Sequence, residues 1–253
     1  MTVLKVELEF QNSKMSSGKV IDPYTPPADV RIGVVAGDTI TFKAKLTPAV
    51  TLANSDYVWS GAQSGNGPTI AITFANACNY AEGLSVLGCP NLVARVTAMD
   101  VPLPNRAAWA ILNPIAAAAA YNLATEALNW AAANWNALGG SSAAHNCRAD
   151  AARHSYWNLI MSLDPDMDVA HAEGAATAHE RTNLESTPNM HNEIVMDLQN
   201  NAVGRSLSSG FTSSTPRATL QAAIVSALNA GSLTILDDLT NANEVGLLKP
   251  SNQ

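Results

Sequence analysis

The stretch VPLPNRAAWAILNPIAAAAAYNLATEALNW, residues 101–130, decides the fold of this chain. Pro102 and Pro104 interrupt the chain, and from Arg106 to Leu138 the sequence becomes rich in alanine, the residue with the highest helix propensity. Pro114 fits the start of a helix better than its interior, so we expect two helices that are broken near this residue. The prolines therefore mark a boundary between two parts of different structure.

Upstream of this boundary, residues 1–103 are predicted to form a β domain. Six segments alternate or run in β-branched residues, and Gly, Pro and Asn separate them. These segments are Val3 to Phe10, Val30 to Val35, Thr39 to Leu46, Tyr57 to Ser60, Thr69 to Phe74 and Leu92 to Ala98. Their spacing predicts a small β-sandwich.

Part of this region resembles a known type of module. The run Tyr57-Val-Trp-Ser-Gly, followed by Gly67 to Phe74, resembles the immunoglobulin-like and PKD-like modules of many bacterial surface and secreted proteins. The resemblance implies that Trp59 anchors the core and that this domain docks or spaces another one. No polar residues converge in this region, which favours a structural role.

Downstream, residues 104–253 are predicted to form an all-α domain, which makes the fold class α+β multidomain. After the alanine-rich helices, a Gly-Gly-Ser-Ser hinge precedes a helix from about Ala144, and four further helical segments follow. They are expected near Met167 to Arg181, Glu193 to Arg205 and Pro216 to Ala230, with a short acidic helix at Leu236 to Leu239. Polar residues interrupt the apolar run Ala107 to Leu128, so a buried helix is favoured over a membrane span.

Composition and charge exclude some classes of function. The 253 residues are 47% hydrophobic and 14% charged, enough to bury a sizeable core. The net charge is −7, and residues 145–205 carry nine carboxylates, four arginines and no lysine. A surface that neutralises phosphates is missing there, so no nucleic-acid partner is expected.

The N-terminus and the cysteines bear on the cellular location. The first ten residues alternate like a strand and lack the features of a secretory signal, so we expect secretion or injection without a Sec signal, or a cytoplasmic stage before export. Cys78 and Cys89 are spaced to pair, whereas Cys147 would be left over; three buried free thiols are the open alternative.

The chemistry is expected where the five histidines lie, between His145 and His191. On the helix that follows Cys147, Asp150 and His154 share a face with Trp157 or Asn158, and Arg153 adjoins them. An Asp one turn before a His can fix the tautomer of the ring and raise its basicity. The alternative is a surface pair of a few tenths of a kcal/mol.

Two further helices supply polar residues to the same region. His171 and His179 are about 80° apart around a helix, so we expect His179 with Glu180 to face the site and His171 to be a solvated or capping residue. On the next helix, a polar stripe holds Glu193, Asp197, Asn200, Asn201 and Arg205. Oxygen ligands of this kind suit a hard cation or a polar substrate.

These motifs carry a resemblance over about residues 145–210. The series Asp150-x-x-Arg-His-x-x-Trp-Asn158, His179-Glu180 and Met196-Asp-Leu-x-Asn-Asn-x-x-Gly-Arg205 resembles an uncharacterised domain of bacterial toxin-type and secreted proteins. The resemblance implies an effector or toxin-like hydrolase. The helix around His154 is more loosely similar to phospholipase-A2-like enzymes, although Ser155 stands where those have a calcium-binding Asp.

The sequence thus predicts a hydrolase of the cell envelope, most simply of phospholipid esters, with His154 as general base. The predicted catalytic residues are Asp150, Arg153, His154, Glu180 and Asp197; the predicted substrate-binding residues are Trp157, His179, Asn200, Asn201 and Arg205. Asp197, Glu180 and Asn201 are candidate ligands for a divalent cation, Ca²⁺ or Zn²⁺.

Two other classes remain as alternatives. A peptidoglycan-directed hydrolase would use paired acids in a long polar groove. A non-catalytic binding or structural protein would use the polar helices as a satisfied buried core. A secretion-apparatus partner or an immunity protein is expected for an effector.

Overall fold

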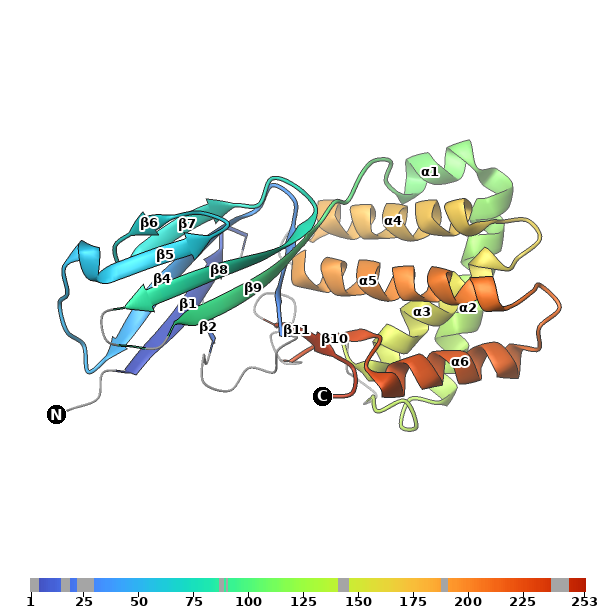
Figure 1. Ribbon diagram of the computed structural model, residues 1–253. Helices are drawn as coiled ribbons and strands as arrows, with labels where there is room; N and C mark the ends of the chain where they lie inside the picture. The colour runs from blue at the N-terminus through green and yellow to red at the C-terminus, as the bar shows by residue number, and fades with distance from the viewer. Residues whose placement is uncertain are drawn as a thin grey trace.

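The computed structural model describes residues 5–14, 19–21, 30–86, 89, 91–140, 146–187, 191–237 and 246–253. The chain has an α+β arrangement, in which β-strands come first and helices follow (Figure 1). This coarse division at the prolines after β9 agrees with the prediction from sequence.

The N-terminal strands form two sheets. The first sheet is antiparallel with the order β2 (Lys19–Ile21), β1 (Lys5–Asn12), β4 (Thr39–Thr47) and β7 (Thr69–Thr73). The second has the order β3 (Ile32–Val35), β9 (Leu92–Met99), β8 (Cys78–Val86), β5 (Tyr57–Gly61) and β6 (Gly65–Asn66). Its strand pairs are antiparallel except β3 with β9, which are parallel. A 3₁₀ turn, η1 (Asn54–Asp56), precedes β5.

One apolar core lies between the two sheets. Along β1, Val6, Leu8 and Phe10 are buried while the residues between them are more exposed, as the period of two requires. The expected core anchor, Trp59, is 1% exposed and donates its Nε1–H to the carbonyl of Gly67 at 2.8 Å. This hydrogen bond satisfies the polar atom of a buried indole.

The strand β8 was missed in the sequence because its first half, Cys-Asn-Tyr-Ala-Glu-Gly, does not alternate apolar and polar residues. Cys78 begins β8 and Cys89 lies beyond its end, so the strand alone separates them by roughly 26 Å. A disulfide between them is therefore ruled out in this fold. The alternative of three buried thiols is also wrong in part, because Cys147 is buried whereas Cys78 is exposed and Cys89 is partly exposed.

The helices follow the order expected from sequence, with the break at Pro114 confirmed. They are α1 (Arg106–Leu112), α2 (Pro114–Ala133), α3 (Arg148–Ser162), α4 (Val169–Ser186), α5 (His191–Leu207) and α6 (Arg217–Ala230), with a 3₁₀ turn η2 (Ser208–Gly210) after α5. No helix among the described residues is long and apolar enough to cross a membrane.

Helix α3 is the centre of the helical part. Twelve of its fifteen residues are buried, and α2, α4, α5 and α6 pack around it (Figure 1). It begins at Arg148 and not near Ala144, because Asn146 has a left-handed φ of 66° and cannot continue a helix. Residues 141–145 lie outside the described part of the chain.

The end of the chain differs from the all-α prediction. Thr234–Leu236 form the strand β10, which pairs with β11 (Leu248–Pro250), so the short acidic helix expected from Leu236 is wrong at its start. The β-branched Thr-Ile pair favours a strand here; residues 238–245 lie outside the described ranges. Leu248 also pairs with Arg31 beside β3, which ties the C-terminal segment to the sandwich.

The helical part rests on the sandwich through the N-terminus of α5. His191 Nδ1 lies 2.7 Å from Asp38 Oδ2, and this buried carboxylate also accepts hydrogen bonds from Asn12 Nδ2 and Val35 N. On β3, a Cβ atom added to Gly33 would lie only 3.1 Å from the Cα of Asn192. The sandwich and α5 are therefore in direct backbone contact.

Helices α3 and α5 approach each other closely at Gly204, and this contact yields a first prediction. A Cβ atom at Gly204 would lie 2.0 Å from the carbonyl oxygen of Ser155. Gly204→Ala gains helix propensity, but the helices must separate, so we expect a net loss of about 1–3 kcal/mol. Thermal unfolding followed by circular dichroism should show a lower Tm.

Gly210→Ala is the matched control, because a Cβ atom there meets nothing within 4 Å. Its Tm should stay close to that of the wild type. An unchanged Tm in Gly204→Ala would mean that the close contact between α3 and α5 is wrong.

Candidate functional site

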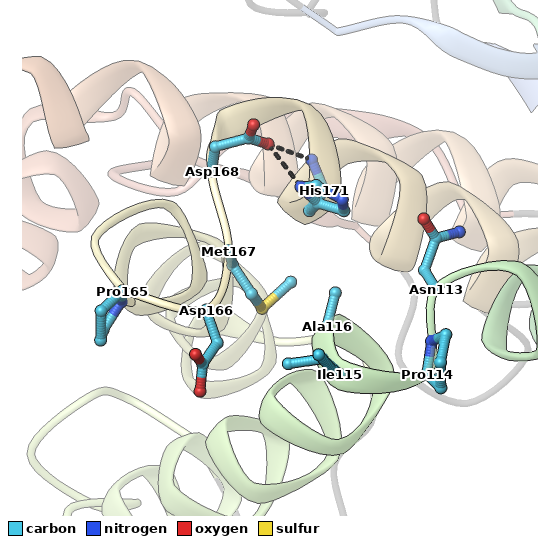
Figure 2. Close-up of a pocket in the computed structure, with 9 residues that line it drawn as sticks. All are labelled: Asn113, Pro114, Ile115, Ala116, Pro165, Asp166, Met167, Asp168 and His171. Carbon is cyan, nitrogen blue, oxygen red and sulfur yellow. Dashed lines mark hydrogen bonds and ion pairs between the residues drawn. The ribbon is translucent and has the colours of Figure 1, made fainter.

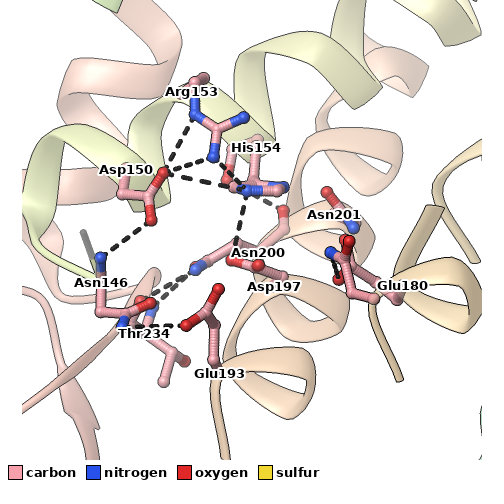
Figure 3. Close-up of polar contacts among 12 residues, drawn as sticks. Asn146, Asp150, Arg153, His154, Glu180, Glu193, Asp197, Asn200, Asn201 and Thr234 are labelled. Atoms are coloured by element: carbon pink, nitrogen blue, oxygen red, sulfur yellow. Dashed lines mark hydrogen bonds and ion pairs between the residues drawn. The ribbon is translucent and has the colours of Figure 1, made fainter. Parts of the chain in front are cut away.

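Three helices bring polar residues that are far apart in the sequence into one buried polar cluster (Figure 3). Its members are Asp150, Arg153 and His154 from α3, Glu180 from α4, and Glu193 and Asp197 from α5. The four carboxyl groups are each at most 3% exposed. All five predicted catalytic residues are therefore in this cluster.

Arg153 lies at the centre of the cluster. Its guanidinium donates to Asp150 Oδ1 through Nε at 3.0 Å and through Nη2 at 2.5 Å. The same Nη2 lies 2.7 Å from Nε2 of His154. Since arginine can only donate, Nε2 must be the acceptor, and His154 is neutral with its proton on Nδ1.

The pKa values of Asp150 and His154 follow from this contact. Burial opposes ionisation of Asp150, but the charge of Arg153 and a hydrogen bond from Asn146 N bring its pKa down to about 2. For His154, burial and the positive charge of Arg153 both hold the pKa well below 6.5. The expectation that Asp150 raises the basicity of this ring is therefore wrong, because burial and Arg153 outweigh the effect of the carboxylate. At neutral pH the site thus contains a carboxylate, a guanidinium and a neutral imidazole.

The pKa values of Glu180 and Asp197 are shifted in the opposite direction, upward. Burial raises the pKa of Glu180 to about 8, and the charges of Glu193 and Asp150 act in the same direction. Burial and the neighbouring carboxyl groups also hold the pKa of Asp197 well above its ordinary value of 3.8. Glu180 Oε1 and Asp197 Oδ1 are buried and have no hydrogen-bond partner among the described residues. The cluster therefore holds more carboxyl groups than Arg153 can neutralise, and two of them favour their protonated forms.

Three of these residues could hold a metal ion. One ligand atom from each of Asp150, His154 and Asp197 lies within 4.8 Å of the others, and Asp197 Oδ1 is 3.4 Å from His154 Nε2. The unpartnered oxygen of Asp197 and the excess of carboxylates fit a cation. This set shares Asp197 with the predicted one, whereas it replaces Glu180 and Asn201 by Asp150 and His154.

A network of side-chain hydrogen bonds joins α3 and α5 beside the cluster. Arg205 Nη1 donates to Asn158 Oδ1 at 3.0 Å, and Asn158 Nδ2 donates to Asn201 Oδ1 at 2.7 Å. Asn201 lies beside His154 (Figure 3). Asn200 instead exchanges two hydrogen bonds with the backbone of Thr234, at 2.8 and 2.9 Å, and so anchors β10.

Asn146 is a residue of the site that the sequence did not reveal. Its backbone N–H donates to Asp150 Oδ2 at 2.9 Å and its side-chain amide donates to Glu193 Oε2 at 3.1 Å. Asparagine tolerates the left-handed backbone that places both donors over the cluster. No motif marks such a position, since the signal is a single dihedral angle.

Beside the cluster lies an apolar groove of about 510 Å³ between α1, α2, α3 and α4. Its walls are mainly alanines with Trp109, Tyr121, Leu128 and Trp157. Its polar residues are Arg106, Thr125, Arg153 and His179. Arg153 therefore faces the groove while its guanidinium touches Asp150 and His154, which do not line the groove.

His179 and Trp157 belong to the groove and not to the buried cluster. Their rings meet edge to face at 5.9 Å, and Trp157 Nε1 is satisfied by the carbonyl of Ala120. Burial and the charges of Arg106 and Arg153 lower the pKa of His179 to about 4. The sequence predicted His179 and Glu180 as a pair, but adjacent residues on a helix face different sides.

The other histidines take no part in the cluster. His171 is exposed and pairs with Asp168, the N-cap of α4, beside a separate hollow between the α1–α2 corner and the turn before α4 (Figure 2). This agrees with the expected solvated or capping role. His191 contacts Asp38 at the junction with the sandwich, and His145 lies outside the described residues.

Comparison with known families gives one match. Residues 107–232, a little under half of the chain, match a domain of unknown function, DUF6973. The match spans α3, α4 and α5 and also includes Asn146, so it contains the whole cluster. The family description assigns no function to the domain. No curated protein and no solved structure matches the chain.

The raised pKa of Glu180 yields a prediction on stability. Between pH 4.5 and about 8 the folded protein keeps a proton on Glu180 that the unfolded chain has lost. Stability conferred by this proton is present at low pH and is lost as the pH rises through that window. Glu180→Gln carries no such proton, so its stability relative to the wild type should increase from pH 5 to pH 8.

The measurement is urea unfolding of both proteins at pH 5, 6, 7 and 8. One proton gives a slope of at most about 1.4 kcal/mol per pH unit. The exposed Glu173→Gln controls for the loss of a carboxylate from the chain. A stability difference between Glu180→Gln and wild type that does not change with pH would show that Glu180 is ionised in the fold.

Proposed function

We propose that this chain hydrolyses phospholipid esters, with the buried polar cluster as its reaction centre and the apolar groove as its lipid site. The observation that carries the proposal is the position of Arg153. This residue lines the apolar groove, and its guanidinium contacts both Asp150 and His154. A lipid whose phosphate binds Arg153 would place its ester next to the one basic nitrogen of the cluster.

In this reaction His154 acts as general base. Its Nε2 lone pair takes a proton from water, and the hydroxyl oxygen attacks the ester carbonyl carbon. The ester C–O bond then breaks, the alcohol leaves with the proton returned by His154, and a fatty acid is released. Asp150, which lies 3.9 Å from Nε2, stabilises the imidazolium, and Arg153 neutralises the phosphate.

The same side chains also suit a second role, the binding of a divalent cation. Asp150, His154 and Asp197 would hold it, and it would supply a Lewis acid that activates water or polarises the ester carbonyl. Arg153 Nη2 lies next to both Asp150 and His154, so a cation held there would have to displace the guanidinium. His154 would then be a ligand and not the base.

The burial of His154 favours a second candidate function, binding of a lipid without hydrolysis. His154 is only 2% exposed, so a substrate reaches it only if Arg153 moves. A peptidoglycan-directed hydrolase has less support, because its glycan would need a long polar groove and this groove is lined mainly by apolar side chains.

We also propose that the N-terminal sandwich is an immunoglobulin-like or PKD-like docking module of a secreted or injected bacterial effector. Two facing sheets around a buried tryptophan support this class of module. An effector that attacks lipids would require an immunity protein in the producing cell and a secretion-apparatus partner.

The test is the release of fatty acid from vesicles of mixed bacterial phospholipids. We expect release by the wild type and a loss of about 10²–10⁴-fold in His154→Gln, which removes the base but keeps a polar side chain of similar size. Parallel assays with Ca²⁺, with Zn²⁺ and with EDTA separate the two roles of His154. Loss of activity in EDTA with recovery in one metal would assign it as a ligand.

His171→Ala is the matched control, since this exposed histidine is paired with Asp168 away from the cluster. It should retain wild-type activity. Vesicle binding with no release under any metal condition would support the non-catalytic function, and equal release by His154→Gln and wild type would rule out His154 as base or ligand.

A further inference from the structure

We infer that the apolar groove selects anionic amphiphiles, and that Arg106 at its edge is the residue that recognises the negative head group. The inference rests on the proposed function in using the same groove, and it specifies the class of lipid. Arg106 was not part of the predicted site, because it lies on α1, more than forty residues before the histidine-rich helices.

The groove has two guanidinium groups of different character. Arg153 is held by Asp150, whereas the side chain of Arg106 makes no hydrogen bond or ion pair with any residue in the described part of the chain. Its neighbour Asn105 and the nearby Arg181 already use Glu185. The charge of Arg106 is thus uncompensated at the edge of an apolar groove.

Arg106 brings a positive charge to the edge of the groove, whereas the charge of Arg153 is already paired with Asp150. His179 faces both guanidinium groups, and their charges contribute to its low pKa of about 4, so its imidazole is neutral at pH 7 and adds no charge. An anionic group beside the exposed Arg106 would be attracted to its charge, and the apolar walls next to it screen this interaction less than water does. A zwitterionic head group would gain much less.

The rest of the groove fits an alkyl chain. No charged residue occurs between Arg106 and Glu126, and the wall of α2 presents Ala117, Tyr121, Ala124 and Leu128. A volume of about 510 Å³ is in the range of small-molecule sites. The arrangement of an apolar wall with a cationic end matches an amphiphile with one alkyl chain and an anionic head.

The test is isothermal titration calorimetry of the full chain with dodecyl phosphate, dodecylphosphocholine and inorganic phosphate, below the micelle concentrations. We expect dodecyl phosphate to bind at least tenfold more tightly than either other probe. Arg106→Gln should weaken dodecyl phosphate binding by about tenfold and change dodecylphosphocholine binding little. Arg95→Gln, in the sandwich, is the control for loss of an arginine.

A second pair of variants tests the place of binding. Ala124→Phe fills the groove and should abolish binding of dodecyl phosphate, while Ala118→Phe, on the exposed side of the same helix, should not. Circular dichroism checks that both variants are folded. A groove covered by a second copy of the chain would instead give a dimer by sedimentation that Ala124→Phe dissociates, and this would overturn the inference.

Other results also decide the question. Equal affinity for the two dodecyl probes, or tight binding of inorganic phosphate alone, would contradict recognition of an anionic amphiphile. Tight dodecyl phosphate binding without fatty-acid release would leave this inference standing and reject hydrolysis. Release of fatty acid without any preference for anionic lipids would support hydrolysis and reject this inference.

Discussion

The burial of four carboxyl groups around one guanidinium is the constraint on which the structure of the helical part depends. An isolated charge in the interior costs several kcal/mol, so each acid must be paired, hydrogen-bonded or protonated. Arg153 pairs Asp150, Asn146 bonds both Asp150 and Glu193, and Glu180 and Asp197 have raised pKa values. The three helices can meet only in an arrangement that provides all of these partners.

The packing around the cluster involves the sandwich, which contacts one end of α5. Helix α5 carries Glu193 and Asp197 toward α3, and the two helices are in close contact at Gly204. The opposite end of α5 is fixed by Asp38, whose carboxylate bonds His191 as well as β-domain residues. Asp38 therefore fixes the end of the helix that carries Glu193 and Asp197.

The sequence predicted what depends on local periodicity and on one helix. The proline boundary, the break at Pro114 and the pairing of Asp150 with His154 all follow from spacing along a helix or from backbone chemistry. The groove, the role of Arg106 and the position of Asn146 depend on contacts between helices and on a single left-handed dihedral, for which one sequence carries no signal. The sequence did not predict the strand β8, because both faces of its exposed N-terminal end carry polar residues.

The cluster also bears on the choice between a functional site and a polar core. Buried ion pairs are poor stabilisers, and apolar residues of similar volume would serve the fold at least as well. A core selected for stability would not keep Glu180 Oε1 and Asp197 Oδ1 without partners, nor two acids with raised pKa values beside a neutral histidine. Groups of this kind gather where protons or cations are exchanged. Arg153, with one face on the groove and the other on His154, connects that chemistry to the surface.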